Sequence, residues 1–125
     1  MKHQASTIHE DRALTESESS FIEWLLRNGG SRSALLVPQL SRARVTGRCS
    51  CGCASINLSV DGVSHYGEVG IEPVCEYQWR SEDGELFGVF AFACGELLSG
   101  IDLWSIDGRA TPSELPPVAI LELMP

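Results

Sequence analysis

The chain has 125 residues and a formal net charge of −8, from 17 acidic and 9 basic side chains. This length fits a single folded domain over residues 1–125. With 43% hydrophobic and 21% charged residues, the composition is that of an ordinary globular protein and excludes a fibrous or wholly disordered chain. The sequence has no apolar run long enough to span a bilayer, and its polar start lacks the apolar core of a signal peptide. We therefore expect a cytoplasmic protein with no membrane partner.

The first helix is predicted close to the start of the chain. Residues 1–13 are polar and unpatterned, so we expect them to be disordered. Thr15 and Glu18 have the spacing of a capping box, which predicts a helix start at this point. The helix should run to Asn28, with Gly29 as a left-handed stop.

Apolar side chains recur at helical spacing within this segment and predict its buried face: Phe21, Ile22, Leu25 and Leu26. Trp24 lies at the margin of that face. A second, short and broken helix is expected from Ser33 to about Ser41, because Pro38 disfavours a helical residue before it but is accepted at a helix start.

Five stretches beyond residue 42 have the pattern of strands: residues 43–49, 55–60, 74–80, 85–93 and 97–106. The short turns between consecutive strands leave no room for parallel crossovers. Prolines in residues 110–125 predict an irregular tail. The predicted fold is α+β, with one or two N-terminal helices packed on one face of a roughly five-stranded antiparallel meander sheet.

The charges are distributed unevenly along the chain. Residues 27–48 carry five arginines and no acid, whereas the chain from Asp61 onward carries twelve acids and only two arginines. In a regular first strand Arg42, Arg44 and Arg48 would share one face, either as a solvated surface or as a binding surface. Because a net negative protein is repelled by phosphate backbones, direct nucleic-acid binding is disfavoured. A basic protein partner suits the charge better, although acidity alone also serves solubility.

Three cysteines, Cys49, Cys51 and Cys53, alternate in one short stretch. They would point to one side of an extended chain, and Gly52 allows a tight turn on which they could converge around a metal ion. Zinc needs a fourth ligand, for which His65, Cys75 and Cys94 are the candidates. The spacing differs from the Cys-x-x-Cys of common zinc sites, so we favour a thiol-lined turn without a cofactor. A zinc- or thiol-dependent domain remains the alternative, with Arg48 placed to favour a thiolate.

Enzymatic chemistry has little support in the sequence. It contains no phosphate-binding glycine-rich loop, no Gly-x-Ser-x-Gly elbow and no His-Glu-x-x-His motif. Asp102 lies within an apolar strand, where we expect it to pair with an arginine of the first strand. We therefore predict a protein that is not an enzyme.

Two segments carry a resemblance. Residues 45–58 contain the Arg-Cys-Ser-Cys-Gly-Cys motif, and residues 88–105 contain the turn Cys94-Gly95 and the strand acid Asp102. Together they resemble a family of small bacterial proteins with no assigned activity. A small acidic α+β protein with such a hairpin is also similar to the immunity proteins encoded beside bacterial toxins, especially those of contact-dependent growth inhibition. The resemblance implies a neutralising role but transfers no functional residue.

The resulting functional hypothesis is a non-enzymatic protein-binding domain, an immunity protein for a basic toxin such as a nuclease. An acidic surface accelerates encounter with a basic active site and raises specificity. The acids expected to contact the partner lie on or between the later strands: Glu76, Glu82, Asp83, Glu85 and Asp102.

Overall fold

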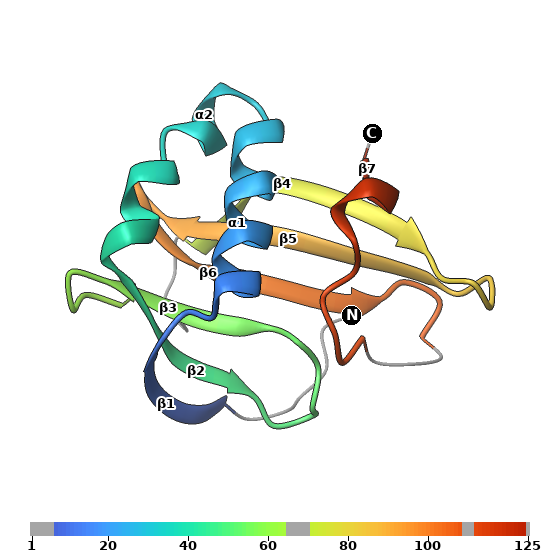
Figure 1. Ribbon diagram of the computed structural model, residues 1–125, viewed down its shortest axis with the longest axis horizontal. Coiled ribbons are helices and arrows are strands. Elements are labelled where there is room, and N and C mark those ends of the chain that lie inside the picture. The colour runs from blue at the N-terminus through green and yellow to red at the C-terminus, as the bar shows by residue number, and fades with distance from the viewer. Residues whose placement is uncertain (1–6, 65–70, 109–111, 125) are drawn as a thin grey trace.

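The computed structural model describes residues 7–64, 71–108 and 112–124. Its elements, in chain order, are β1 (Thr7–Ala13), α1 (Glu16–Asn28), α2 (Ser31–Ala34), η1 (Val37–Arg42), β2 (Ala43–Cys49), β3 (Ile56–Val60), β4 (Ile71–Arg80), β5 (Leu86–Cys94), β6 (Leu97–Ser105), η2 (Val118–Ile120) and β7 (Glu122–Leu123). The strands form one antiparallel sheet, with α1 lying across it (Figure 1). The α+β class and the antiparallel sheet are confirmed, but the sheet has seven strands rather than about five.

The strand order departs from the predicted meander. It runs β1-β2-β3-β6-β5-β4-β7, so the strands pair in chain order within β1 to β3 and within β4 to β6, and the two units meet where β3 pairs with β6. At this junction Ile56 lies opposite Ile101 and Asn57 opposite Gly100. A short turn forces consecutive strands to pair, but β3 ends at Val60 and β4 begins only at Ile71. That longer connection frees β4 from pairing with β3.

Two strands lie where the sequence predicted irregular structure. The expectation of disorder for residues 1–13 is wrong for residues 7–13, which form β1 and pair with β2. β1 is an edge strand with mostly exposed side chains and a register shift between His9 and Arg12, so it has no apolar alternation. In the proline-rich tail, β7 pairs with Tyr77 and Gln78 of β4. The tail therefore completes the other edge of the sheet.

Helix α1 begins and packs as predicted. Thr15 and Glu18 form both hydrogen bonds of the capping box. Its buried residues are the four of the predicted face, Phe21, Ile22, Leu25 and Leu26. The Tyr77 hydroxyl donates a 2.6 Å hydrogen bond to the carbonyl of Leu25. This bond ties the middle of β4 to the helix, and the partly buried Trp24 ring lies 5.5 Å from the Tyr77 ring.

The end of α1 differs from the prediction. Gly29 has φ −96°, so it is not a left-handed stop, and Gly30 takes the positive φ of +116°. Gly29 instead permits close packing, since a Cβ there would lie 2.3 Å from Cβ of Cys75. The lack of a side chain lets the helix end rest directly on β4.

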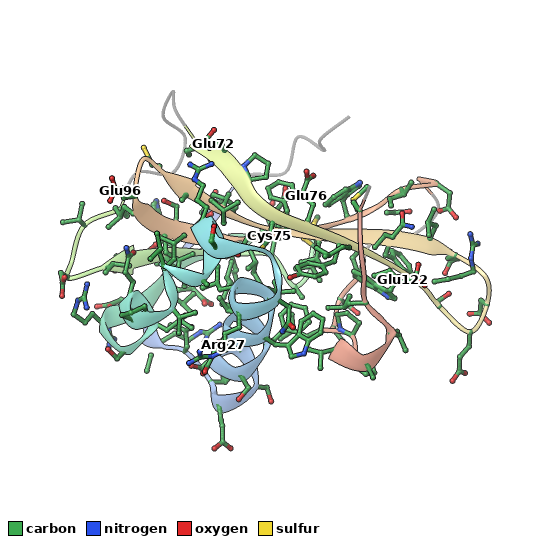
Figure 2. All side chains as sticks on the ribbon, turned by 90° about the horizontal axis from the view of Figure 1, so that it is seen from above. Arg27, Glu72, Cys75, Glu76, Glu96 and Glu122 are labelled. Atoms are coloured by element: carbon green, nitrogen blue, oxygen red, sulfur yellow. The ribbon has the colours of Figure 1, made fainter. Side chains whose placement is uncertain are left out.

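The helices and the C-terminal segment lie on the same side of the sheet (Figure 2). Buried side chains of all the central strands face them, among them Val45, Leu58, Val89 and Leu103, and the tail adds Leu115, Val118 and Leu121 at the margin of this core. On the opposite face, a Cβ at Gly88 would lie 2.5 Å from the indole of Trp104. Among the described residues, no helix is both long and apolar enough to cross a membrane.

Candidate functional site

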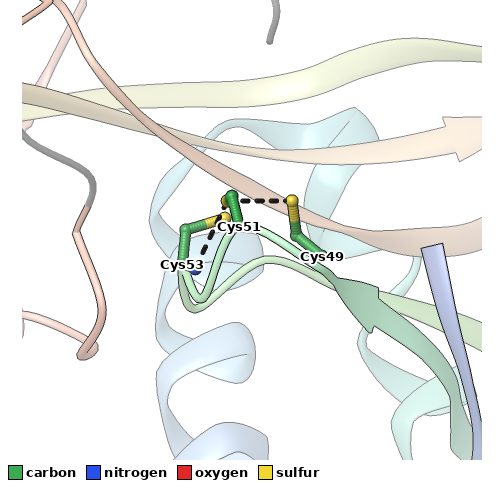
Figure 3. A group of neighbouring side chains, drawn as sticks. All are labelled: Cys49, Cys51 and Cys53. Carbon is green, nitrogen blue, oxygen red and sulfur yellow. Dashed lines mark hydrogen bonds between the residues drawn. The ribbon is translucent and has the colours of Figure 1, made fainter. Parts of the chain in front are cut away.

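The three clustered cysteines meet at the connection between β2 and β3, which we call the cysteine turn (residues 49–53). Cys49 is the last residue of β2, and the turn is closed by a 3.3 Å hydrogen bond from the N–H of Gly52 to the carbonyl of Cys49. Gly52 has φ +91°, a conformation that L side chains rarely adopt. The three sulfur atoms all lie within 4.8 Å of one another, and those of Cys49 and Cys51 are 2.9 Å apart (Figure 3). The predicted convergence of the three thiols is therefore confirmed.

The base of the cysteine turn is fixed by neighbouring segments. The N–H of Ala54 donates a 2.9 Å hydrogen bond to the carbonyl of Pro112 in the C-terminal segment. The buried thiol of Cys53 donates to the hydroxyl of Ser55, at 3.2 Å. That hydroxyl in turn donates to Asp102 Oδ1 and accepts from the N–H of Leu103, each at 2.8 Å. Cys53 is thus held against β6, while Cys51 lies exposed at the top of the turn.

Within the cluster, the pKa values of Cys49 and Cys51 are shifted in opposite directions. Burial and the hydrogen bond with Cys51 raise the pKa of Cys49 to about 12. Burial would also raise the pKa of Cys51, but the hydrogen bonds from the Cys49 thiol and the Cys53 backbone N–H outweigh it and hold that pKa below its ordinary value. Cys51 therefore becomes a thiolate more readily than Cys49 does.

Neither of the two described candidates for a fourth ligand lies in this cluster. All five cysteines are thiols, and neither Cys75 nor Cys94 belongs to the group of converging sulfurs. Cys75 is buried beneath the end of α1, where burial raises its pKa to about 11. His65 lies outside the described residues. Within the described part of the chain, the site offers three sulfur donors and not the four of a structural zinc site.

The arginines of residues 27–48 are all paired with acids. The pairs are Arg27 with Glu23, Arg32 with Glu72, Arg42 with Asp61, Arg44 with Asp11 and Arg48 with Glu10. Each acid comes from another segment or from the same helix, which the sequence alone does not show. The arginine-rich stretch is therefore neutralised within the fold.

The arginines of β2 do not share one face. The register shifts between Val45 and Gly47, so Thr46 lies in a bulge and the side-chain alternation is interrupted. Arg44 pairs with Ser59 in register, whereas Arg48 pairs with Ile56, a residue of the helix-side core. The predicted arginine face is therefore wrong.

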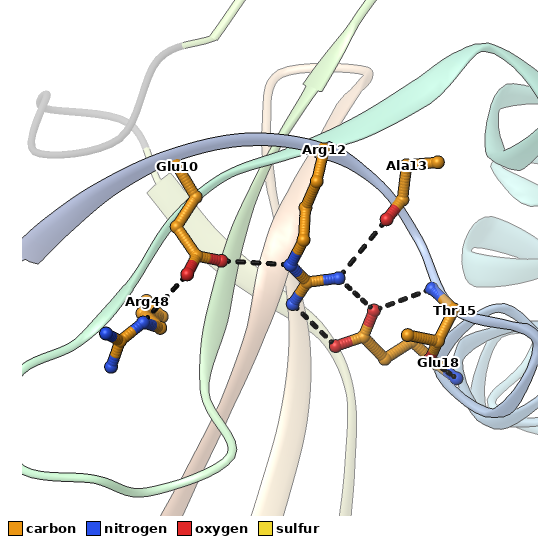
Figure 4. Close-up of polar contacts among 6 residues, drawn as sticks. All are labelled: Glu10, Arg12, Ala13, Thr15, Glu18 and Arg48. Atoms are coloured by element: carbon orange, nitrogen blue, oxygen red, sulfur yellow. Dashed lines mark hydrogen bonds and ion pairs between the residues drawn. The ribbon is translucent and has the colours of Figure 1, made fainter.

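Arg48 belongs to a chain of charged hydrogen bonds that runs from β2 through β1 to α1 (Figure 4). Arg48 donates to Glu10 at 2.8 Å, and Arg12 donates to Glu10 at 3.0 Å. Arg12 also donates two hydrogen bonds to Glu18, at 2.9 and 3.0 Å. Arg48 is thus engaged by the carboxylate of Glu10.

Three of the predicted partner-binding acids gather at the turn between β4 and β5, which we call the acidic tip: Glu82, Asp83 and Glu85. Glu82 and Asp83 are exposed and Glu85 is half-buried. The nearby Arg80 donates to the carbonyl of Gly84 at 2.6 Å. None of the three acids has an ion pair with another described residue, so their charge is presented to solvent.

The remaining two predicted acids lie apart from the acidic tip. Glu76 is exposed in the middle of β4, and the exposed Glu122 of β7 lies opposite Gln78, two residues further along β4. Sequence reasoning missed Glu122 because its pairing with β4 is not local. Asp102 is only 7% exposed and bonds to Ser55, while the three arginines of residues 42–48 bond to other acids. The expected ion pair of Asp102 with one of these arginines is wrong, and Asp102 is not part of the acidic surface.

Comparison of the chain with protein-family models, with curated proteins and with solved structures finds no match in any of the three. The resemblance to small bacterial proteins and to immunity proteins therefore stays a prediction.

Proposed function

We propose that this chain is a non-enzymatic, cytoplasmic protein that binds a basic protein partner and neutralises it, as an immunity protein does for a toxin such as a nuclease. One observation carries the proposal. The five arginines of residues 27–48 are paired with acids inside the fold, whereas the acids of the tip have no ion pair among the described residues. The excess of acidic over basic side chains that gives the net charge of −8 therefore lies in the later part of the chain, from Asp61 onward.

The acidic tip and Glu76 are the proposed contact residues, with Glu122 added. Exposed acids that are not already neutralised attract a cationic surface over about 10 Å at ordinary ionic strength and raise its association rate. Charge complementarity of this kind gives specificity and speed more than raw affinity. A basic nuclease site, built to hold phosphates, is a surface of the required charge.

The test is co-expression of this chain with the protein encoded immediately beside its gene. We expect that neighbour to be basic, to stop growth when expressed alone, and to be neutralised by a stable complex with this chain. A neighbour that is harmless, or that remains toxic and unbound, would overturn the proposal.

The acidic tip is tested by charge reversal in that complex. Glu82→Lys, Asp83→Lys and Glu85→Lys together should slow association more than about tenfold and reduce its dependence on salt. The matched comparison sets the single variant Asp83→Lys against the single variant Glu96→Lys. Glu96→Lys makes the same charge change at an exposed residue at the other end of β5. Equal effects of these two single variants would show that total charge, and not the acidic tip, governs binding.

A further inference from the structure

The cysteine turn is not used by the proposed partner surface, and its geometry is specific. Three sulfur atoms converge within 4.8 Å from five consecutive residues. Thiols that serve only as small apolar side chains are usually buried, but Cys51 is exposed and Cys49 is half-buried. The sulfur cluster is therefore open to solvent on one side and anchored through Cys53 on the other.

We propose that Cys49, Cys51 and Cys53 form a binding site for one thiophilic monovalent metal ion, Cu(I), held by three sulfur ligands. Soft thiolate sulfur is the donor that Cu(I) selects. Zinc in a structural site requires four ligands in a tetrahedron, whereas Cu(I) is satisfied by three in a plane. The described residues place three sulfur atoms together and bring no fourth cysteine, histidine or carboxylate into that group.

The distances fit such an ion after small movements. A metal–thiolate bond is about 2.3 Å long, which puts three trigonal sulfurs about 4 Å apart. The sulfurs of Cys49 and Cys51, now 2.9 Å apart, must separate by about 1 Å. Cys51 can make this movement because it is exposed in the turn, next to Gly52. Cys53 can stay in place, since its neighbours Ala54 and Ser55 are hydrogen-bonded to other segments.

Binding forms three Cu–S bonds and breaks the S–H bonds that the thiols still carry, with their protons released to solvent. The ion enters and remains as Cu(I), so no electron is transferred. The hydrogen bonds that the Cys51 sulfur accepts from the Cys49 thiol and the Cys53 backbone N–H favour its thiolate, which can bind the ion first.

The test is anaerobic titration of the reduced full chain with Cu(I), supplied as its acetonitrile complex, against a chromogenic Cu(I) chelator. We expect one ion per chain, a thiolate-to-copper absorption band in the near ultraviolet, and X-ray absorption showing three sulfur neighbours at about 2.3 Å. No binding in competition with the chelator, or fewer than three sulfur neighbours, would overturn the proposal.

Variants separate this site from adventitious binding. Cys51→Ser, at an exposed position, should keep the fold and weaken Cu(I) binding more than about tenfold. Cys94→Ser is the matched control, because Cys94 lies at the end of β5 outside the cluster, and it should change nothing. The second variant is Cys53→Ser, which should weaken Cu(I) binding in the same way; if it unfolds the chain, Cys49→Ser replaces it. Equal loss in Cys94→Ser, or a Zn(II) complex that withstands excess Cu(I), would also overturn the proposal.

Discussion

Arg12 of β1 donates two hydrogen bonds to the carboxylate of Glu18 in the first turn of α1, at 2.9 and 3.0 Å. The same carboxylate accepts the backbone N–H of Thr15 and so completes the capping box. One side chain thus caps the helix and binds the edge strand. Because β1 exposes most of its side chains, this contact is a main reason why residues 7–13 are held as a strand.

We therefore predict that Arg12→Ala destabilises the protein by about 1–2 kcal/mol, the usual cost of losing charged hydrogen bonds, reduced because Arg12 is partly exposed. The measurement is the free energy of unfolding in urea. Arg27→Ala is the matched control, since the Arg27–Glu23 pair is more exposed and lies within one helix, and it should cost less than about 0.5 kcal/mol. An equal loss in both variants would contradict a special role for Arg12.

The contact between Arg12 and Glu18 also makes the free energy of unfolding depend on pH. The Arg12 hydrogen bonds hold the pKa of Glu18 below its ordinary value, against the opposing effect of burial. A depressed folded-state pKa contributes stability that is fully present above the unfolded pKa of about 4.3 and is lost as the pH falls through the folded value. We predict a stability plateau between about pH 5 and 7 from this group, with a decline below about pH 4. Glu18→Gln should flatten that decline in urea unfolding, and an unchanged acid slope would count against this explanation.

Thiol reactivity should differ sharply within the chain. Cys51 is exposed and its pKa is lowered, since hydrogen bonds from Cys49 and Cys53 outweigh burial, whereas burial raises the pKa of Cys75 to about 11. Because the thiolate is the reactive form, iodoacetamide at neutral pH should label Cys51 first and Cys75 only after unfolding. Peptide mass spectrometry over time measures this order. Comparable rates for the two residues in the folded protein would contradict it.

The Tyr77 hydroxyl offers a test of how α1 is attached to the sheet. Its buried 2.6 Å hydrogen bond reaches the carbonyl of Leu25. Tyr77→Phe keeps the ring and removes the hydroxyl, which also contacts the Cys75 thiol, so we expect a loss of about 1–2 kcal/mol in urea unfolding. Ser41→Ala removes an exposed hydroxyl that donates to Pro38 and should cost much less. Similar losses in the two variants would show that the Tyr77 bond contributes little.

The sequence predicted the elements whose apolar period is local. The face of α1 follows from helical spacing, and β3 and β5 from strand alternation. β1 was not predicted, because ion pairs rather than an apolar face hold this strand to its neighbours. The pairing of β3 with β6 was not predicted either. The connection between β3 and β4 is long, so the packing of the whole sheet decides the strand order.

In the candidate site, too, the local features could be predicted from the sequence and the long-range contacts could not. The convergence of Cys49, Cys51 and Cys53 follows from alternate positions within five residues. Their anchoring does not, because Ser55 bonds to Asp102 and Leu103, residues more than forty positions away. The prediction of an arginine face was wrong for a local reason, since a single bulge at Thr46 moves the side chains that follow to the opposite face of the sheet.

The contact between the end of α1 and β4 gives the last prediction. Ala forms helices better than Gly by about 1 kcal/mol, so Gly29→Ala would stabilise an open helix end. Here the new Cβ would lie 2.3 Å from Cβ of Cys75 and 2.8 Å from Oγ of Ser33, both of which are buried. Overpacking of this kind costs about 1–3 kcal/mol, which outweighs the gain in helix propensity. We therefore expect a net loss in urea unfolding and a lower Tm, and an unchanged or raised stability would mean that α1 does not rest on β4 at Gly29.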